Sequence, residues 1–279
     1  MLRFTPNSRL LAAVALMIGC VAGCNSEAGP ANEQAEETAS QEATQQLASQ
    51  QQDDPEDVEL IERFGGQSEP PKLPPPVGAS AMPKPNRTWI DAKRGLVLVD
   101  GYVSLREGML EMFACPVGTK EHESVVAVYS WAQVVHAALL AVGAETGAPV
   151  QFDPEFRPPT GTQIDIEVRW LDEAGQWQSA KAQDWVKDVF TGKSMAHPWV
   201  FAGSGFWKDE ATGKEHYMAE AGDFICVSNF STATLDIPVE SSQVNEGLLF
   251  EAFTEKIPPL GTPVRLVLKP RLEEVATEK

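Results

Sequence analysis

The chain has 279 residues, of which 43% are hydrophobic and 22% charged, the balance expected of a globular protein. Its formal charge is −18, and acidic residues are in excess both in residues 25–88 (−8) and in residues 89–279 (−12). Because nucleic-acid binding depends on Lys and Arg contacts to phosphates, this balance argues against a nucleic-acid partner and against a polybasic membrane-binding surface.

Residues 1–23 have the pattern of an export signal. Two arginines precede an apolar run over residues 10–22, which is shorter than the roughly 20 residues that a stable membrane span needs. The run ends in Val-Ala-Gly-Cys24, which resembles the bacterial lipobox, whose cysteine is lipidated and becomes the mature N-terminus. We therefore predict a lipoprotein signal peptide over residues 1–23 and a lipid, palmitate among its acyl chains, on Cys24. Cys20 is a second candidate, and an ordinary cleaved signal without a lipid is the alternative.

The pattern of this N-terminus predicts where the protein is located and that a membrane is one of its partners. A lipid on Cys24 would anchor the protein to a membrane of the bacterial cell envelope, facing the periplasm or the exterior. An export signal without a lipid would also place it outside the cytoplasm.

Residues 24–88 are predicted to be a disordered, acidic and Pro-rich tether. Residues 25–64 hold mostly Gln, Glu, Ala, Ser and Asp, with too few large apolar side chains to offset the entropy cost of folding. Residues 65–88 contain seven prolines, which favour an extended spacer. The tether would hold a domain away from the membrane. The alternative is that its prolines form a ligand for a partner domain.

The folded part is predicted to span residues 89–279 and to belong to the α+β class, with a mainly antiparallel sheet and one clear helix packed on it. The helix is expected over residues 131–142, with Ser130 as its N-cap and Gly143 after its end. Asp100-Gly101 is a turn signal between two short strands. The strands are expected at residues 96–99, 102–103, 109–115, 125–129, 164–170, 177–185, 199–206, 215–219, 224–227, 235–238 and 264–268.

Several blocks resemble the YdjY-domain family of bacterial proteins, over about residues 94–240. The first is Gly118-Thr-Lys-Glu-His-Glu-Ser124, followed by Val135-His136 and the rest of the predicted helix. Others, such as Trp199-Val-Phe-Ala-Gly-Ser204, are similar to the lipoprotein branch of that family. The resemblance implies no particular activity, because none is established for the family. Some relatives carry four-iron ferredoxin-type modules, which need Cys-x₂-Cys-x₂-Cys runs.

Cys115 and Cys226 are the only cysteines after residue 24, so the domain cannot hold an iron–sulfur cluster. In an oxidising compartment the two could pair as a disulfide. The alternative is that they are two separately buried thiols. The sequence leaves both readings open.

Five polar residues are candidates for a ligand or metal site: Lys120, His122, Glu123, Ser124 and His136. His122 in a turn and His136 on the next helix could converge, and together with Glu123 they are of the kinds that bind zinc. Their spacing matches no named metal motif. In the structural alternative, Glu123 and Ser124 satisfy the backbone of a turn and His136 is a buried helix residue.

The sequence contains no strong catalytic motif. Ser204, in Ala-Gly-Ser-Gly-Phe, resembles a nucleophile elbow only loosely, and no Walker A or dinucleotide-binding motif is present. We therefore expect a membrane-anchored lipoprotein with a non-enzymatic binding or structural domain, whose partner is an envelope protein or a small-molecule ligand, and no cofactor. The alternative is a divalent-metal site, or a metal-dependent enzyme, built from His122, Glu123 and His136.

Overall fold

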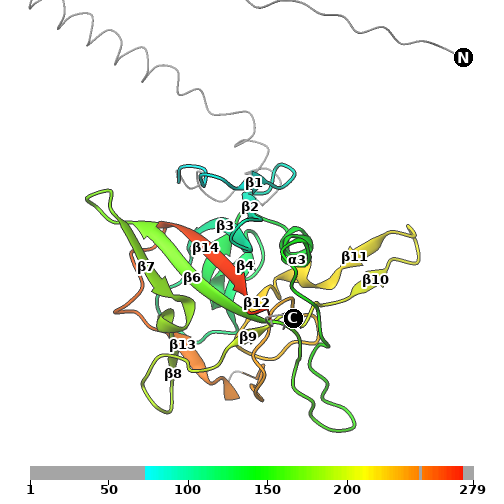
Figure 1. The fold of residues 1–279 in the computed structure, drawn as a ribbon. Coiled ribbons are helices and arrows are strands. Elements are labelled where there is room, and N and C mark those ends of the chain that lie inside the picture. Colours follow the sequence, from blue (N-terminus) through cyan, green and yellow to red (C-terminus); the bar gives the residue numbers. More distant parts are fainter. Residues whose placement is uncertain (1–72, 245–246, 273–279) are drawn as a thin grey trace, which may run out of the picture. The chain divides into compact units, whose positions relative to one another are not determined.

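The computed structural model describes residues 73–244 and 247–272. The predicted signal peptide, Cys24 and most of the predicted tether lie outside these residues. The described part is mainly β structure with one α-helix, as expected (Figure 1). None of its helices has the length and apolar character needed to cross a membrane.

The described elements are, in chain order, β1 (Ser80–Ala81), β2 (Thr88–Asp91), β3 (Leu96–Val103), β4 (Met112–Pro116), the 3₁₀ helix η1 (Glu121–Glu123), β5 (Ser124–Val128), α3 (Ala132–Ala141), β6 (Gln163–Leu171), β7 (Trp177–Lys181), η2 (Ala182–Trp185), β8 (Val186–Asp188), β9 (Trp199–Val200), β10 (Phe206–Lys208), β11 (Glu215–Tyr217), η3 (Met218–Ala221), β12 (Ile225–Cys226), β13 (Phe250–Ala252) and β14 (Pro263–Pro270).

A ten-stranded sheet forms the centre of the domain. Its main path runs in the order β12-β4-β5-β3-β14-β6-β7, while β1, β2 and β9 pair at its side. Among the described pairs of this sheet, only β4 and β5 run parallel. The chain's last strand, β14, lies between β3 and β6 and is antiparallel to both (Figure 1). Residues more than 150 positions apart in the sequence therefore become direct neighbours in the middle of the sheet.

The alternating pattern of β6 gives the sheet two different faces. Ile164, Ile166 and Val168 are buried in the main hydrophobic core. The same core contains Val135 and Leu139 from α3, so the helix covers this face. Because successive side chains of a strand point to opposite faces, the polar residues between them lie on the outer face of the sheet.

The predicted turn at Asp100-Gly101 is wrong, because both residues lie in the middle of β3. Asp100 is fully buried and paired with Arg265. Gly101 lies so close to β5 that a Cβ atom there would collide with the carbonyl oxygen of Ala127. In β3, Asp100 forms an internal ion pair, and Gly101 allows the close approach of β5.

The ordered domain begins before the predicted boundary at Trp89. Residues 73–88, which we assigned to the tether, contain β1, which pairs with β2 through Ser80 and Ile90. Leu73 is buried, and the carbonyl oxygen of Pro74 accepts a hydrogen bond from Arg265 at 2.9 Å. This end of the predicted tether is therefore attached to the sheet through Leu73, β1 and the Pro74 carbonyl oxygen.

The predicted N-cap of α3 is also different. Ser130 is buried and bonds to the Thr88 hydroxyl at 2.7 Å instead of capping the helix. The first free N–H groups of the helix, those of Ala132 and Gln133, donate to the carboxylate of Glu220 at 3.1 and 2.8 Å. A carboxylate is favourable at this end because of the positive end of the helix dipole.

The second half of the domain follows the predicted strands in part. The predicted hairpin partners form β6 with β7 and β10 with β11. The predicted strand at 199–206 is interrupted between β9 and β10. The expected strand at 235–238 contributes only single bridges, through Leu235 and Asp236.

Candidate functional site

The Lys120 motif forms a charged cluster. The Lys120 ammonium lies 3.1 Å from Asp223 Oδ1, 3.4 Å from Glu123 Oε1 and 3.6 Å from Glu111 Oε2. It also lies 4.5 Å from the centre of the Phe230 ring. Burial alone would lower the pKa of Lys120, but the three carboxylates together raise it. Lys120 and Glu123 are among the residues predicted from the sequence, whereas Glu111 and Asp223 are not, because they come from distant segments.

This cluster has a structural character, because it holds three segments of the chain together. Gly222 packs against the stem of Lys120, where a Cβ atom would lie 2.6 Å from Lys120 Cγ. Burial and the neighbouring Glu123 carboxylate raise the pKa of Glu111. All three acceptors are already engaged by one cation, so the cluster connects the start of β4, η1 and the segment before β12.

The structure does not bring His122 and His136 into a common site. The His122 side chain is 76% exposed, and its nearest charged neighbour is Glu123 Oε2 at 3.8 Å. His136 is half-buried, and its Nδ1 lies 2.9 Å from the Tyr217 hydroxyl. No group of three or more His, Cys, Asp or Glu within the described residues is arranged to hold a metal ion. The geometry therefore gives no support to the alternative of a metal site built from His122, Glu123 and His136.

His136 instead belongs to a buried polar network. Its ring contacts Phe201 and Tyr217 edge-on, and the Tyr217 hydroxyl also lies 3.1 Å from Thr234 Oγ1. Burial lowers the pKa of His136, which favours the neutral ring. Ser204 has a positive φ of 53°, but its hydroxyl donates to the carbonyl oxygen of Thr232 at 2.6 Å. That hydroxyl is engaged by backbone, so the nucleophile-elbow reading gains no support.

The two cysteines are free, buried thiols, and the disulfide considered from the sequence is not formed. Cys115 packs with Val117, Ala127 and Tyr129. Cys226 lies in a different cluster, and its thiol contacts the Met112 sulfur at 3.4 Å. Burial raises the pKa of Cys115 to about 11 and that of Cys226 well above its usual value. Ser124, the last residue of the predicted motif, is buried and lies beside the Cys115 thiol.

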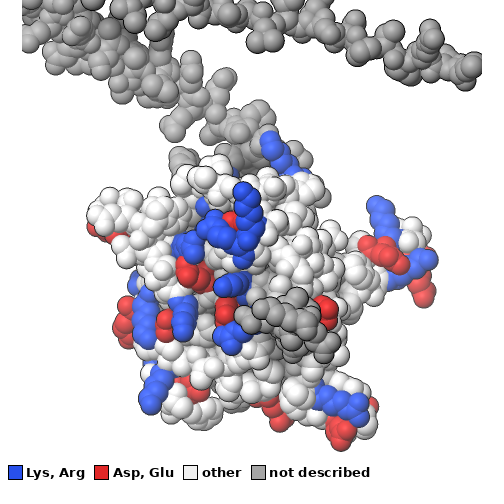
Figure 2. Space-filling view, viewed as in Figure 1, with Lys and Arg blue, Asp and Glu red and all other residues white. Residues whose placement is uncertain are grey.

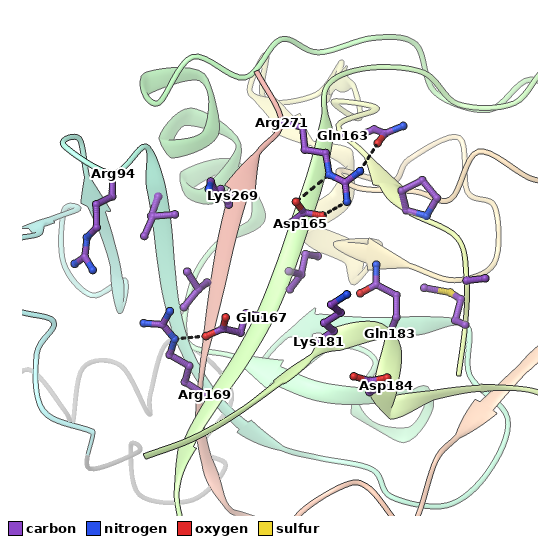
Figure 3. Close-up of a pocket in the computed structure, with 16 residues that line it drawn as sticks. Arg94, Gln163, Asp165, Glu167, Arg169, Lys181, Gln183, Asp184, Lys269 and Arg271 are labelled. Carbon is purple, nitrogen blue, oxygen red and sulfur yellow. Dashed lines mark hydrogen bonds and ion pairs between the residues drawn. The ribbon is translucent and has the colours of Figure 1, made fainter. Parts of the chain in front are cut away.

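A large cavity lies elsewhere, on the outer face of the sheet. It is a groove of about 990 Å³, within the size range of sites for small organic ligands. Its lining comes from β3, β14, β6, β7, η2 and the segment 195–198 (Figure 3). Its basic residues are Arg94, Arg169, Lys181, Lys269 and Arg271. Its acidic residues are Asp165, Glu167 and Asp184.

The charge of this groove is opposite to that of the domain. Residues 89–279 contain 16 basic and 28 acidic residues, and the groove is lined by five of the former but only three of the latter. Figure 2 shows Lys and Arg side chains gathered on this face, around β14 and β6, with Asp and Glu between them. Such a concentration of positive charge in an acidic domain attracts anions.

Strand register explains how the groove is assembled. On β6, Asp165 faces Lys269 of β14. Two residues along, Glu167 faces Lys181 of β7. Every second residue of these strands reaches the outer face, so residues scattered between positions 94 and 271 meet on one surface. No local pattern predicts this surface, because these cations form neither a run nor a motif.

The cations of the groove differ in how far they are neutralised. Arg271 makes a two-pronged ion pair with Asp165, at 2.9 and 2.6 Å, and Arg169 pairs with Glu167 (Figure 3). Lys181 and Lys269 have no ion pair with any described residue. These two ammonium groups therefore remain available to a ligand.

The comparison with known proteins defines the family. The sequence profile of the YdjY domain matches residues 88–269. The chain belongs to the YdjY-domain family. The YdjY domain thus includes the Lys120 cluster, β3, β6, β7 and nearly all of β14. No curated protein and no solved structure matches the chain.

Proposed function

We propose that this chain is an exported lipoprotein, anchored to a membrane through Cys24, whose YdjY domain is a non-enzymatic binding module for an anionic ligand. The observation that carries the binding part is the groove: a cavity of about 990 Å³ with five cations, in a domain rich in acidic residues. Two of these cations, Lys181 and Lys269, have no described ion-pair partner. Binding an anion would supply that partner.

The environments of the three candidate nucleophiles, Cys115, Cys226 and Ser204, favour a binding role over a catalytic one. A reactive cysteine needs a lowered pKa and some exposure, whereas both Cys115 and Cys226 are buried and have raised pKa values. The Ser204 hydroxyl donates to a backbone carbonyl. None of these three residues lines the groove.

Titration of the mature chain with citrate and with pyrophosphate tests the anion site. The double variant Lys181→Ala/Lys269→Ala should weaken binding by about five- to thirtyfold, because each exposed charge pair contributes on the order of 0.5–1 kcal/mol. Lys208→Ala/Lys214→Ala on the β10–β11 hairpin removes the same charge away from the groove and should leave affinity unchanged. Equal weakening by both double variants would reduce the effect to net charge and overturn the assignment of the groove.

The anchor is tested independently by labelling cells with a palmitate analogue. Wild-type protein should carry the label and fractionate with membranes, whereas Cys24→Ala should lose the label. Cys20→Ala is the matched control and should retain both properties. A labelled Cys24→Ala protein, or an unlabelled wild type, would contradict the proposed anchor.

A further inference from the structure

The groove continues at both ends into neighbouring cavities. One of about 540 Å³ shares Arg94, Glu167 and Arg169 with it and extends to Trp177. Another, of about 740 Å³, shares Gln163 and Arg271 and extends to Leu272. The shared residues Gln163 and Arg169 lie at opposite ends of β6, so the three cavities follow this strand, and such an elongated surface suits a chain-like ligand better than a compact anion.

The groove lies on the face of the sheet, so its ligand must be recognised by side chains. Its floor includes β14 and β6, whose backbone groups are paired with strands on both sides. A peptide usually gains affinity from a sheet by pairing with free backbone groups at an edge. On the face of this sheet the backbone groups of β14 and β6 are already paired with each other and with their neighbours. This arrangement favours a ligand that carries its own polar groups along its length.

The side chains along the groove combine three chemistries. Lys181 and Lys269 supply unpaired positive charge. Side-chain amides come from Gln163 and Gln183 in the central groove, where Gln163 Oε1 accepts from Arg271 at 3.3 Å and Gln183 Nε2 donates to the His197 carbonyl oxygen at 3.4 Å. Amides both donate and accept hydrogen bonds, as hydroxyl groups do. Trp177, 47% exposed, provides an apolar ring with one polar tip beside them.

We infer that the groove binds an acidic oligosaccharide, a chain of sugar units that carries carboxylate groups. This rests on the proposed anion site and names its ligand class. The cations would pair with the carboxylates, the glutamine amides with the hydroxyls, and the Trp177 ring with the apolar face of a sugar.

The placement of the two free lysines fits a chain. Lys269 and Lys181 lie on strands separated by β6 and are offset by two residues along it. Strand spacing then places their Cα atoms about 10 Å apart across the sheet and about 7 Å apart along it. Two carboxylates on different sugar units can meet both ammonium groups at such a separation.

The test is a length series of oligogalacturonates, titrated into the mature chain carrying Cys24→Ala. Affinity should rise by about tenfold or more from the monomer to the hexamer, because additional units reach additional groups in the groove. Trp177→Ala should weaken hexamer binding several-fold and leave monomer binding unchanged. Trp207→Ala is the matched control, because Trp207 is 49% exposed on the β10–β11 hairpin, and it should change neither.

Three outcomes overturn the inference. One is equal affinity for monomer and hexamer. Another is equal or tighter binding of a glutamate hexapeptide, which would assign the groove to acidic peptides. The third is equal binding of an uncharged maltohexaose. If citrate still binds and requires Lys181 and Lys269, the anion site stands without the oligosaccharide; if no anion binds, both proposals fall.

Discussion

Asp100 and Arg265 form a two-pronged ion pair in the middle of the sheet, although 165 positions separate them in the sequence. Arg265 Nε lies 2.6 Å from Asp100 Oδ1, and Nη2 lies 3.0 Å from Oδ2. The two side chains are 5% and 0% exposed. Arg265 also donates to the carbonyl oxygen of Pro74, so one guanidinium connects β3, β14 and the N-terminal end of the described domain.

Arg265→Ala should destabilise the domain by about 3–5 kcal/mol, because it leaves the Asp100 carboxylate buried with only Arg87 as an ion-pair partner among the described residues. Chemical denaturation measures the change. Arg157→Ala breaks an exposed pair with Glu155 and should cost less than about 1 kcal/mol. If both variants lose a similar free energy of unfolding, the buried pair stabilises the domain no more than an exposed pair does.

Gly101→Ala should also destabilise strongly, by about 3 kcal/mol or more, because its Cβ would collide with the backbone of β5. Gly205→Ala is the milder comparison, since its Cβ would meet only the flexible Met218 side chain at 3.3 Å. Thermal melting of the two variants gives the ranking. If Gly101→Ala melts at the wild-type temperature, β3 and β5 cannot be as close as the structure shows.

Asp236 should make stability depend on pH. Burial raises the pKa of Asp236 to about 7, from 3.8 in the unfolded chain. Between these two values the folded form holds a proton that the unfolded form has released, so stability falls as pH rises and becomes constant above about 7. One pKa unit corresponds to about 1.4 kcal/mol, so the decline attributable to Asp236 is on the order of 4 kcal/mol.

Asp236→Asn removes this titration while its side-chain oxygen can still accept from Asn229 and from the Ile237 amide. Unfolding free energies at pH 4 and pH 8 should therefore differ less in this variant than in the wild type. Glu210→Gln, on the exposed hairpin, serves as the control and should keep the wild-type dependence. A variant with an unchanged pH dependence would show that Asp236 titrates normally.

Glu220→Ala should cost about 1–2 kcal/mol, because the first N–H groups of α3 lose the carboxylate that accepts from them. Ser130→Ala tests the capping position expected from the sequence and should leave those two N–H groups satisfied. Hydrogen exchange at Ala132 and Gln133 distinguishes the variants, since it should accelerate in Glu220→Ala alone. Acceleration of exchange in Ser130→Ala alone would show that Ser130 caps the helix, as the sequence predicts.

Local patterns predicted the elements of the fold better than their connections. The alternation in β6 and the helical spacing of Val135, Ala138 and Leu139 arise from which face each side chain buries, and they identified a strand and a helix. Asp100-Gly101 misled the prediction because this pair often forms turns. Its role in a strand depends on Arg265, whose proximity is visible only once β14 has been placed beside β3.

The candidate site was less predictable for the same reason. The Lys120 motif is contiguous and was recognised, but its carboxylate partners Glu111 and Asp223 come from other segments. The groove was harder to predict, because the alternation in β6 places Asp165, Glu167 and Arg169 on one face but does not indicate which residues of β7 and β14 lie beside them. Their meeting depends on strand order and register, which composition and periodicity do not specify.

The most direct measurement is a map of where an anion binds. Amide ¹H–¹⁵N spectra of the mature chain, recorded during a citrate titration, report this residue by residue. We expect saturable shifts concentrated in β6, β7, η2 and residues 195–198 and 269–271, and their loss in Lys181→Ala/Lys269→Ala. Shifts centred on the Lys120 cluster or on the β10–β11 hairpin, or none that saturate, would contradict this expectation.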